Sequence, residues 1–460
     1  MNTVSSAMVW ICCCGWIVNS IAVADDWTQW RGENRDARVT NFAAPTSWPA
    51  ELRQVWKVTV GDGVATPALT GGKVFVFSRE GTNEVVRCLQ ASDGTEIWQD
   101  RYPARQITGA AGGFPGPRCS PAVADGKVCF VGVHGVVTCY EADSGKRLWQ
   151  NRDYEGEVPR FNTSSSPVII DGLCVAQLGT GNSGGVVAFD LGSGQVRWKW
   201  IGDGPAYGSP SVIRLGDIVA IVAPTESKMV AINVADGNLM WEQGYTQGRY
   251  NAASPIVAGD LLIFAGPNRG ATALRVSVVD GKLQMAEAWR NDQSTVQFNT
   301  PVLRDNGLFG LSAQNQLFCV NAQTGETTWT APFDPNTPQP PPAGAERGGG
   351  ERGQRGEQGQ RGEQGQRGER GNREGGGRQG GGRQGGGGGG AGYGSVVDAG
   401  DVMVALNPTG RLVAFAPHDT EFQQLAAYKV ASEGTYAYPI LDGEHILVKD
   451  RDSVIMYSLK

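Results

Sequence analysis

Short runs of apolar residues alternate with polar turns along most of this chain, and the alternation repeats as a longer unit. Each unit opens with a small residue and a proline and continues through β-like apolar runs. It then turns at an Asp-Gly, Ser-Gly or Thr-Gly pair and closes with a tryptophan. Three copies span Ala65–Trp98, Cys119–Trp149 and Ser165–Trp198. Short strands that repeat about every 40–50 residues predict the blades of a β-propeller.

Six units carry both the opening proline and the closing tryptophan, and their prolines are Pro67, Pro121, Pro167, Pro210, Pro255 and Pro301. A seventh unit, from Ser395 to Tyr428, has neither residue, and an eighth opens at Pro439 without a last strand. Residues 54–60 resemble a closing strand with no unit before them. We therefore predict an all-β, eight-bladed β-propeller of four-stranded antiparallel blades. Pairing of its N- and C-terminal strands closes the ring and removes two unpaired edges.

The tryptophans occupy one repeated position in the units. They are Trp56, Trp98, Trp149, Trp198, Trp241, Trp289 and Trp329. An indole buries a large flat surface, and its N–H needs a partner when buried. We predict that these residues join neighbouring blades, with ligand stacking by an individual tryptophan as the alternative.

The first 24 residues have the pattern of a secretory signal peptide. Residues 7–18 are continuously apolar, and Ala22-Val23-Ala24 provides small residues at a cleavage site. An uncleaved membrane anchor is the alternative. Beyond this segment no stretch is long and apolar enough to span a bilayer, so we expect a periplasmic or secreted protein.

Residues 334–394 interrupt the propeller, which we assign to 25–333 (closing strand and blades 1–6) and 395–460 (blades 7 and 8). The insertion begins with a proline-rich stretch and continues in Gly, Arg, Gln and Glu with few apolar side chains. Such a composition predicts disorder, because little burial is available to offset the entropy of ordering. Glycine recurs at every third position from Gly353 to Gly371, but the stretch contains no proline to support a collagen helix. Its arginines leave contact with a polyanion as an alternative to a solvated linker.

Composition narrows the function classes. The net charge of −6 gives no reason to expect nucleic acid, which is bound by basic surfaces. Six cysteines follow the signal, and three of them, Cys88, Cys139 and Cys319, each precede a closing tryptophan by ten residues. One repeated strand position predicts small buried side chains rather than disulfides between blades.

We expect the protein to be a monomer.

Catalytic motifs are weak in this chain. Gly181–Gly185 matches G-x-S-x-G, but a strand and a turn follow it where a nucleophile elbow needs a helix. The three histidines, His134, His418 and His445, have no second ligand at metal spacing. We therefore assign no catalytic residue and no metal site.

A binding site, if present, is expected where the residues before each inner strand converge at one mouth of the central channel. Tyrosine, asparagine and arginine are frequent there and offer stacking faces and hydrogen-bond donors. Ordinary rim polarity is the alternative. The candidates are Arg118, Arg160, Asn162, Tyr207, Arg249, Tyr250, Asn251, Asn299, Tyr393 and Tyr436. Residues 101–118 form a long, glycine-containing loop that we expect to cap this mouth.

The repeated element resembles the motif of pyrroloquinoline-quinone (PQQ)-type propellers. Glu141–Trp149 (EADSGKRLW) shows it, as do Ala91–Trp98, Ala235–Trp241 and Ala322–Trp329. From residue 27 to residue 460, apart from the insertion, the chain resembles PQQ-like propellers of the group that includes the outer-membrane assembly scaffold BamB. The segments WTQWRG (27–32) and FPGPR (114–118) are similar to versions common in exported planctomycete proteins.

This resemblance implies one of two functions. Quinoprotein dehydrogenases of the family hold PQQ and calcium over the propeller axis, against a disulfide of adjacent cysteines. The only adjacent cysteines here lie within the signal, at Cys12–Cys14. We therefore expect no cofactor and a non-catalytic scaffold that binds a protein partner in the cell envelope. The alternatives are an oxidoreductase or sensor that uses PQQ with calcium at the channel mouth, and a secreted carbohydrate-binding or lytic propeller.

Overall fold

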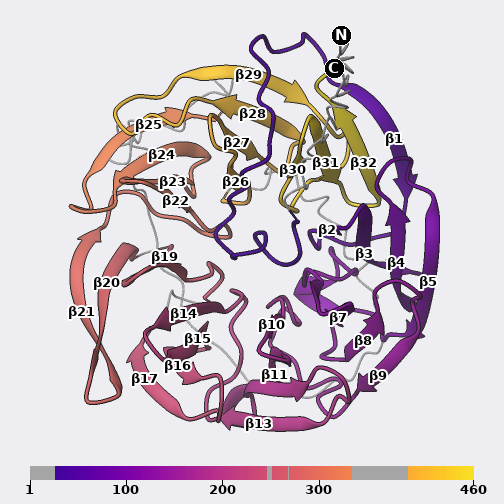
Figure 1. Ribbon diagram of the computed structural model, residues 1–460, viewed down its shortest axis with the longest axis vertical. Helices are drawn as coiled ribbons and strands as arrows, with labels where there is room; N and C mark the ends of the chain where they lie inside the picture. Colours follow the sequence, from indigo (N-terminus) through magenta and orange to yellow (C-terminus); the bar gives the residue numbers. More distant parts are fainter. Residues whose placement is uncertain (1–25, 246–250, 268, 334–391) are drawn as a thin grey trace, which may run out of the picture.

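The computed structural model describes residues 26–245, 251–267, 269–333 and 392–460. The predicted signal peptide and nearly all of the predicted insertion lie outside these ranges. Eight four-stranded antiparallel sheets form a closed ring around a central channel (Figure 1). The predicted eight-bladed propeller is therefore confirmed. No helix in the described ranges has the length and hydropathy needed to cross a membrane.

The first four blades contain the following strands, in order from the channel outward. Blade 1 has β2 (Ala68–Thr70), β3 (Lys73–Glu80), β4 (Asn83–Gln90) and β5 (Glu96–Pro103). Blade 2 has β6 (Ala122–Ala124), β7 (Lys127–Val131), β8 (Val137–Glu141) and β9 (Arg147–Asn151). Blade 3 has β10 (Val168–Ile170), β11 (Leu173–Leu178), β12 (Gly185–Asp190) and β13 (Val196–Ile201). Blade 4 has β14 (Ser211–Leu215), β15 (Ile218–Pro224), β16 (Lys228–Asn233) and β17 (Leu239–Gly244).

The other four blades follow the same plan. Blade 5 has β18 (Ile256–Ala258), β19 (Leu261–Gly266), β20 (Gly270–Val279) and β21 (Lys282–Asn291). Blade 6 has β22 (Val302–Arg304), β23 (Gly307–Leu311), β24 (Gln316–Asn321) and β25 (Thr327–Pro332). Blade 7 has β26 (Ser395–Asp398), β27 (Met403–Leu406), β28 (Arg411–Phe415) and β29 (Gln424–Lys429). Blade 8 has β30 (Ile440–Asp442), β31 (His445–Lys449), β32 (Ser453–Ser458) and, as its outer strand, β1 (Arg53–Thr59). Two short 3₁₀ turns, η1 (Gly109–Ala111) and η2 (Gly181–Ser183), lie in loops.

The ring closes as the sequence predicted. Strand β1 pairs antiparallel with β32, from Arg53 opposite Ser458 to Thr59 opposite Ser453. The first and last strands of the propeller therefore share one sheet, and neither leaves an unpaired inner edge.

In five blades the closing tryptophan donates its indole N–H to a carbonyl of the following blade. Trp56 of the closing strand β1 makes the same bond. Trp98 donates to Ala142 (3.0 Å), Trp149 to Leu191 (3.0 Å) and Trp198 to Val234 (2.7 Å). The corresponding bonds of Trp56, Trp289 and Trp329 end on Ala91, Ala322 and His418. Trp241 is half-buried and packs in the core between blades 4 and 5.

The glycine of the repeat motif lies against the tryptophan of the preceding blade. A Cβ added to Gly145 would lie 2.4 Å from the Trp98 ring, and one added to Gly194 would lie 2.6 Å from the Trp149 ring. Gly145 also has a φ of +70°, in the left-handed region that glycine tolerates best. The tryptophan and glycine of the motif are thus two halves of one contact between blades.

A belt of hydroxyl groups joins the inner ends of the blades. The residue before the opening proline is serine or threonine in the first six blades. Its hydroxyl accepts a hydrogen bond from the backbone N–H of the equivalent residue in the preceding blade. The Ser120 N–H donates to the Ser166 hydroxyl, and the Ser254 N–H donates to the Thr300 hydroxyl (both 2.9 Å). The same bond joins Tyr438 of blade 8 to Thr66 of blade 1. Since a backbone N–H buried without a partner is costly, this belt explains why the small residue carries a hydroxyl.

The segment 26–43, which we call the N-terminal plug, crosses the centre of the ring and contacts every blade (Figure 1). Backbone bonds tie it to Leu69 of blade 1, Val123 of blade 2, Asp398 of blade 7 and Gly443 of blade 8. The Trp30 indole donates to Ser254 at the start of blade 5 (3.1 Å). The side chains of two arginines contact the remaining blades.

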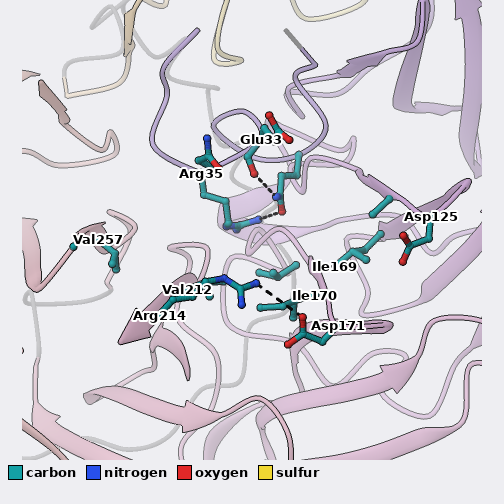
Figure 2. Close-up of a pocket in the computed structure, with 14 residues that line it drawn as sticks. Glu33, Arg35, Asp125, Ile169, Ile170, Asp171, Val212, Arg214 and Val257 are labelled. Carbon is teal, nitrogen blue, oxygen red and sulfur yellow. Dashed lines mark hydrogen bonds and ion pairs between the residues drawn. The ribbon is translucent and has the colours of Figure 1, made fainter. Parts of the chain in front are cut away.

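Arg31 and Arg35 donate to carbonyl groups at the inner ends of blades 3, 4 and 6. Arg35, whose side chain is drawn in Figure 2, donates to the carbonyls of Pro210 (2.8 Å) and Pro167 (3.1 Å) and to the Gln29 side chain. Arg31 donates to Thr300 (3.1 Å) and Pro301 (2.8 Å). Burial, together with the positive charge of Arg31, lowers the pKa of Arg35 to about 9, so this side chain is still protonated at neutral pH. The plug thus places two buried cations in the channel, each held by backbone oxygens.

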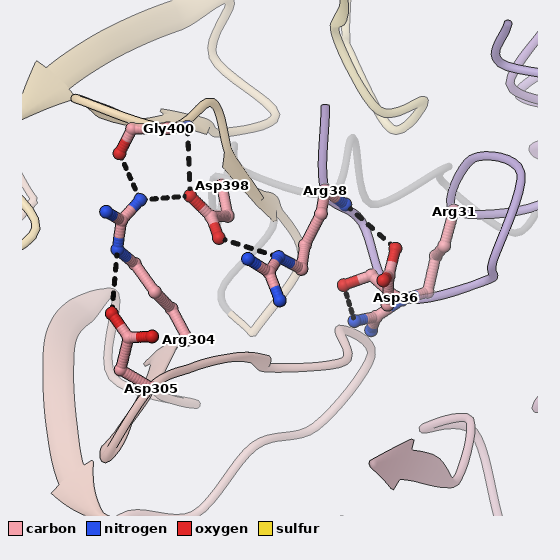
Figure 3. Close-up of polar contacts among 7 residues, drawn as sticks. All are labelled: Arg31, Asp36, Arg38, Arg304, Asp305, Asp398 and Gly400. Atoms are coloured by element: carbon pink, nitrogen blue, oxygen red, sulfur yellow. Dashed lines mark hydrogen bonds and ion pairs between the residues drawn. The ribbon is translucent and has the colours of Figure 1, made fainter. Parts of the chain in front are cut away.

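An acidic residue of blade 7 fixes the plug by ion pairs (Figure 3). The Asp398 side chain is 2% exposed and pairs with Arg38 of the plug (3.0 Å) and with Arg304 of blade 6 (2.6 Å). Arg304 also donates to the Gly400 carbonyl. Asp398 occupies the channel-facing position that is aliphatic in the other blades.

The cysteines and His134 lie inside the fold. All six cysteines after the predicted signal are buried free thiols, in agreement with the prediction of small buried strand residues. The predicted turn residue His134 is also buried, and its Nε2 lies 2.9 Å from the Arg105 carbonyl oxygen.

Candidate functional site

The connections between blades bring aromatic side chains together at one mouth of the channel. These connections end at the inner strands, so their last residues surround the axis. Six half-buried rings, one from each of six connections, form what we call the aromatic crown: Phe114, Phe161, Tyr207, Phe298, Tyr393 and Tyr436.

Four crown rings form a continuous series of contacts. Phe298 stacks on Tyr393, with centroids 4.2 Å apart. Tyr393 meets Tyr436 edge to face at 5.2 Å, and Tyr436 meets Phe114 in the same way at 5.1 Å. Such edge-to-face and stacked pairs stabilise each other beyond simple burial. The loop 101–118 therefore reaches the mouth through Phe114.

Arg118 links this series to the second pair of rings. Its guanidinium donates to the carbonyl oxygens of Phe114 (2.9 Å) and Phe161 (2.5 Å). Phe161 packs against Tyr207 at 5.8 Å, and its backbone N–H donates to the Tyr207 hydroxyl (3.2 Å). Burial lowers the pKa of Arg118. Arg118 therefore connects two parts of the crown by hydrogen bonds and also supplies its central positive charge.

The other predicted residues have different positions. Arg160 is exposed and lies over the Phe161 ring at 5.5 Å, so it adds a cation at the rim. Asn162 is buried in a left-handed turn (φ +65°) in which its N–H donates to the Pro159 carbonyl. Arg249 and Tyr250 lie outside the described residues.

Two predicted asparagines support the mouth from within. The Asn251 amide donates to the carbonyls of Thr225 (2.7 Å) and Tyr245 (2.9 Å). The Asn299 amide donates to the carbonyls of Leu311 (2.8 Å) and Gly392 (3.1 Å). Both side chains are buried. Their donors hold the loops beneath the crown instead of facing a ligand.

The sequence reasoning missed the three phenylalanines of the crown, although a signal was present. An aromatic residue stands two to five positions before the hydroxyl residue in Phe161-Asn162, Tyr207-Gly208, Phe298-Asn299 and Tyr393-Gly394. The prediction considered only polar side chains as candidates. It therefore included the tyrosines and left out the phenylalanines at equivalent positions.

The crown offers stacking surfaces and neutral hydroxyl groups. Burial raises the pKa of both Tyr207 and Tyr436, so these phenols stay protonated and can donate hydrogen bonds. Within the described ranges, no group of three or more His, Cys, Asp or Glu side chains is placed to hold a metal ion. The arrangement is suited to recognising apolar and aromatic groups.

Comparison with known proteins gives relatives of low identity over part of their length. One is the outer membrane protein assembly factor BamB of Yersinia pestis, 24% identical over 64% of this chain and 72% of the relative. Another is BamB of Moranella endobia, 22% identical over 50% of this chain. The chain spans only 55% of that relative.

Solved structures share the fold at still lower identity. BamB from Moraxella catarrhalis superposes with a TM-score of 0.56 at 13% identity, covering 88% of this chain and 99% of that one. Quinohemoprotein alcohol dehydrogenase from Comamonas testosteroni gives 0.63 at 13% identity, covering 95% and 80%. Since both classes share the architecture, these superpositions carry no preference for either activity.

The family model described as "Outer membrane protein assembly factor BamB" matches residues 35–220 and 202–331. These ranges cover more than half of the chain and contain most of the repeats described above. The chain therefore belongs to the BamB family of PQQ-repeat β-propellers.

Proposed function

We propose that this chain is an exported scaffold of the cell envelope that binds a partner protein at the aromatic crown and catalyses no reaction. The observation that carries the proposal is the crown itself, a set of half-buried rings joined around Arg118. Membership of a family named for outer membrane protein assembly supports a periplasmic role of this kind.

The composition of the crown fits a protein interface better than a small-molecule site. Tyrosine, phenylalanine and arginine are enriched in the cores of interfaces, and a few such residues supply most of the binding free energy. The plug closes the channel beneath the crown. The rings are therefore presented on a rigid base, which limits the entropy lost when a partner binds.

Removing two crown rings should abolish partner capture while leaving the propeller folded. Phe114→Ala combined with Tyr436→Ala breaks the edge-to-face contact at the mouth without touching a blade interface. Interface hot spots contribute about 2 kcal/mol or more each, so the loss of two rings should lower the affinity for the partner roughly 10³-fold. The measurement is quantitative recovery of envelope proteins on the immobilised mature propeller.

The matched control for this experiment is Leu425→Ala on the outer strand β29, where the side chain is 38% exposed. Its capture profile should equal that of the unmodified protein. If the crown variant and the control retain the same proteins equally well, the crown is not the binding surface.

The alternative, an oxidoreductase or sensor using PQQ with calcium, draws support from similarity to a quinohemoprotein alcohol dehydrogenase, 24% identical over 30% of this chain. Calcium takes about six to eight oxygen ligands, and the described part of the mouth does not assemble an acidic set to supply them. A saturable rise in melting temperature with PQQ and calcium would favour the alternative over the scaffold.

A further inference from the structure

A second concave site lies at the opposite end of the channel from the crown. It is a cavity of about 560 Å³ between the plug and the inner strands of blades 2–5 (Figure 2). Arg35 and Glu33 line it from the plug, while Asp125 and Asp171 line it from the turns that follow inner strands β6 and β10. A volume of this size is within the range of small-molecule sites, roughly 300–1,000 Å³.

The floor of the cavity is apolar because the plug covers only part of the channel wall. The second residue after the opening proline faces the channel in each blade. At this position Leu69 and Leu441 are buried beneath the plug. The equivalent residues of blades 3–5, Ile169, Val212 and Val257, are half-buried and line the cavity. An aliphatic surface is thus left uncovered on one side of the axis.

The charged groups of the cavity lie at different depths below the surface, with the Arg35 cation buried and the acids near the solvent. Arg35 is 6% exposed, and its Nη2 has no hydrogen-bond partner among the described residues. Glu33 and Asp125 are both exposed, so these two acids lie nearer the solvent. Arg214 lies 4.0 Å from Asp171, which neutralises that pair (Figure 2). The site therefore combines an inner positive charge, an aliphatic floor and outer negative charges.

We propose that this cavity binds a short zwitterionic peptide with aliphatic side chains. The C-terminal carboxylate lies at the Arg35 end of the cavity, because Arg35 is the buried cation among the residues that line it. The aliphatic side chains cover Ile169, Val212 and Val257, and the ammonium group lies at the acidic rim near Glu33 and Asp125. This site is separate from the crown and does not depend on the scaffold proposal.

Isothermal titration of the mature protein with the dipeptide Leu-Leu tests the charge pattern. Hydrogen bonds to charged groups contribute about 1.5–3 kcal/mol, so Leu-Leu amide should bind at least about tenfold more weakly than Leu-Leu. N-acetyl-Leu-Leu should also bind more weakly, because it lacks the ammonium group. Octanoate separates the sources of the carboxylate: binding as tight as that of Leu-Leu would overturn the peptide assignment in favour of a fatty acid.

Two substitutions at equivalent positions test the location. Val257→Trp fills the cavity and should abolish Leu-Leu binding, whereas Leu303→Trp changes the same channel-facing position in blade 6, outside the cavity lining, and should leave binding unchanged. Both variants are first checked for the native β-sheet circular dichroism spectrum. Absence of Leu-Leu binding at millimolar concentration, or equal binding by both folded variants, would overturn the proposal.

Discussion

Replacing Arg35 with methionine is expected to lower the free energy of unfolding by about 2–4 kcal/mol, because buried carbonyls lose charged donors. The guanidinium donates to Pro167 of blade 3 and Pro210 of blade 4, so its loss separates the plug from two blades at once. Arg35→Lys should recover only part of the loss, since an ammonium cannot reproduce the planar fork of donors. Guanidinium chloride unfolding followed by tryptophan fluorescence measures the change.

Arg275→Met is the control for the plug variant. Arg275 pairs with Asp260 (2.8 Å) on the surface, with its side chain 54% exposed. Surface pairs of this kind contribute about 0–1 kcal/mol. Equal effects of the Arg35 and Arg275 substitutions would show that the plug does not hold the ring.

Gly145→Ala should destabilise the propeller by about 3 kcal/mol, although it adds only one methyl group. The backbone at Gly145 is left-handed, with a φ of +70°, which costs an alanine about 1–2 kcal/mol. The new Cβ would also lie 2.4 Å from the Trp98 ring, so blades 1 and 2 must move apart. Overpacking of this kind adds about 1–3 kcal/mol.

Gly126→Ala separates the two causes in the same blade. Gly126 has a φ of +68°, and an added Cβ would meet nothing within 4 Å. It should therefore show the backbone cost alone, about 1–2 kcal/mol, in the same denaturant titration. If the two alanine variants are equally stable, the contact between glycine and tryptophan contributes nothing to the blade interface.

The blades could be predicted from the sequence because each blade needs the same contacts and therefore repeats the same residues. Proline starts an inner strand, tryptophan joins the next blade, and glycine makes room for the previous tryptophan, so the period was visible. Blade 7 lacks the proline and the tryptophan. Ala426, paired with Ala414 just before the bulge of β29, occupies the place that Trp329 has opposite Cys319 in blade 6. Tyr428, the closing residue that the sequence predicted, lies two positions further along the strand, and its hydroxyl donates to the Pro49 carbonyl (2.8 Å).

The plug could not be predicted, since nothing in it repeats. Its shape depends on left-handed backbone at Arg31, Arg35 and Ala37, with φ values of 60–65°. Non-glycine residues adopt this conformation rarely, and it persists where surrounding contacts hold it. Those contacts come from several blades distant in sequence, so no local pattern reports them.

The candidate site was partly within reach of the sequence. The convergence of the connections followed from the fold, and the structure brings Arg118, Tyr207, Tyr393 and Tyr436 to one mouth. Asn251 and Asn299 also lie at this mouth, but their amides donate to loop carbonyls and not toward a ligand. The positions of those carbonyls could not be predicted from the spacing of residues in the sequence.

Site-specific photo-crosslinking in cells tests the central claim, partner binding at the crown, most directly. A benzophenone amino acid is placed at Tyr436 in the crown and, separately, at Leu239, an exposed residue of outer strand β17. The scaffold proposal predicts a discrete protein adduct from position 436 and none from position 239. No adduct from the crown, or the same adducts from both positions, would contradict it.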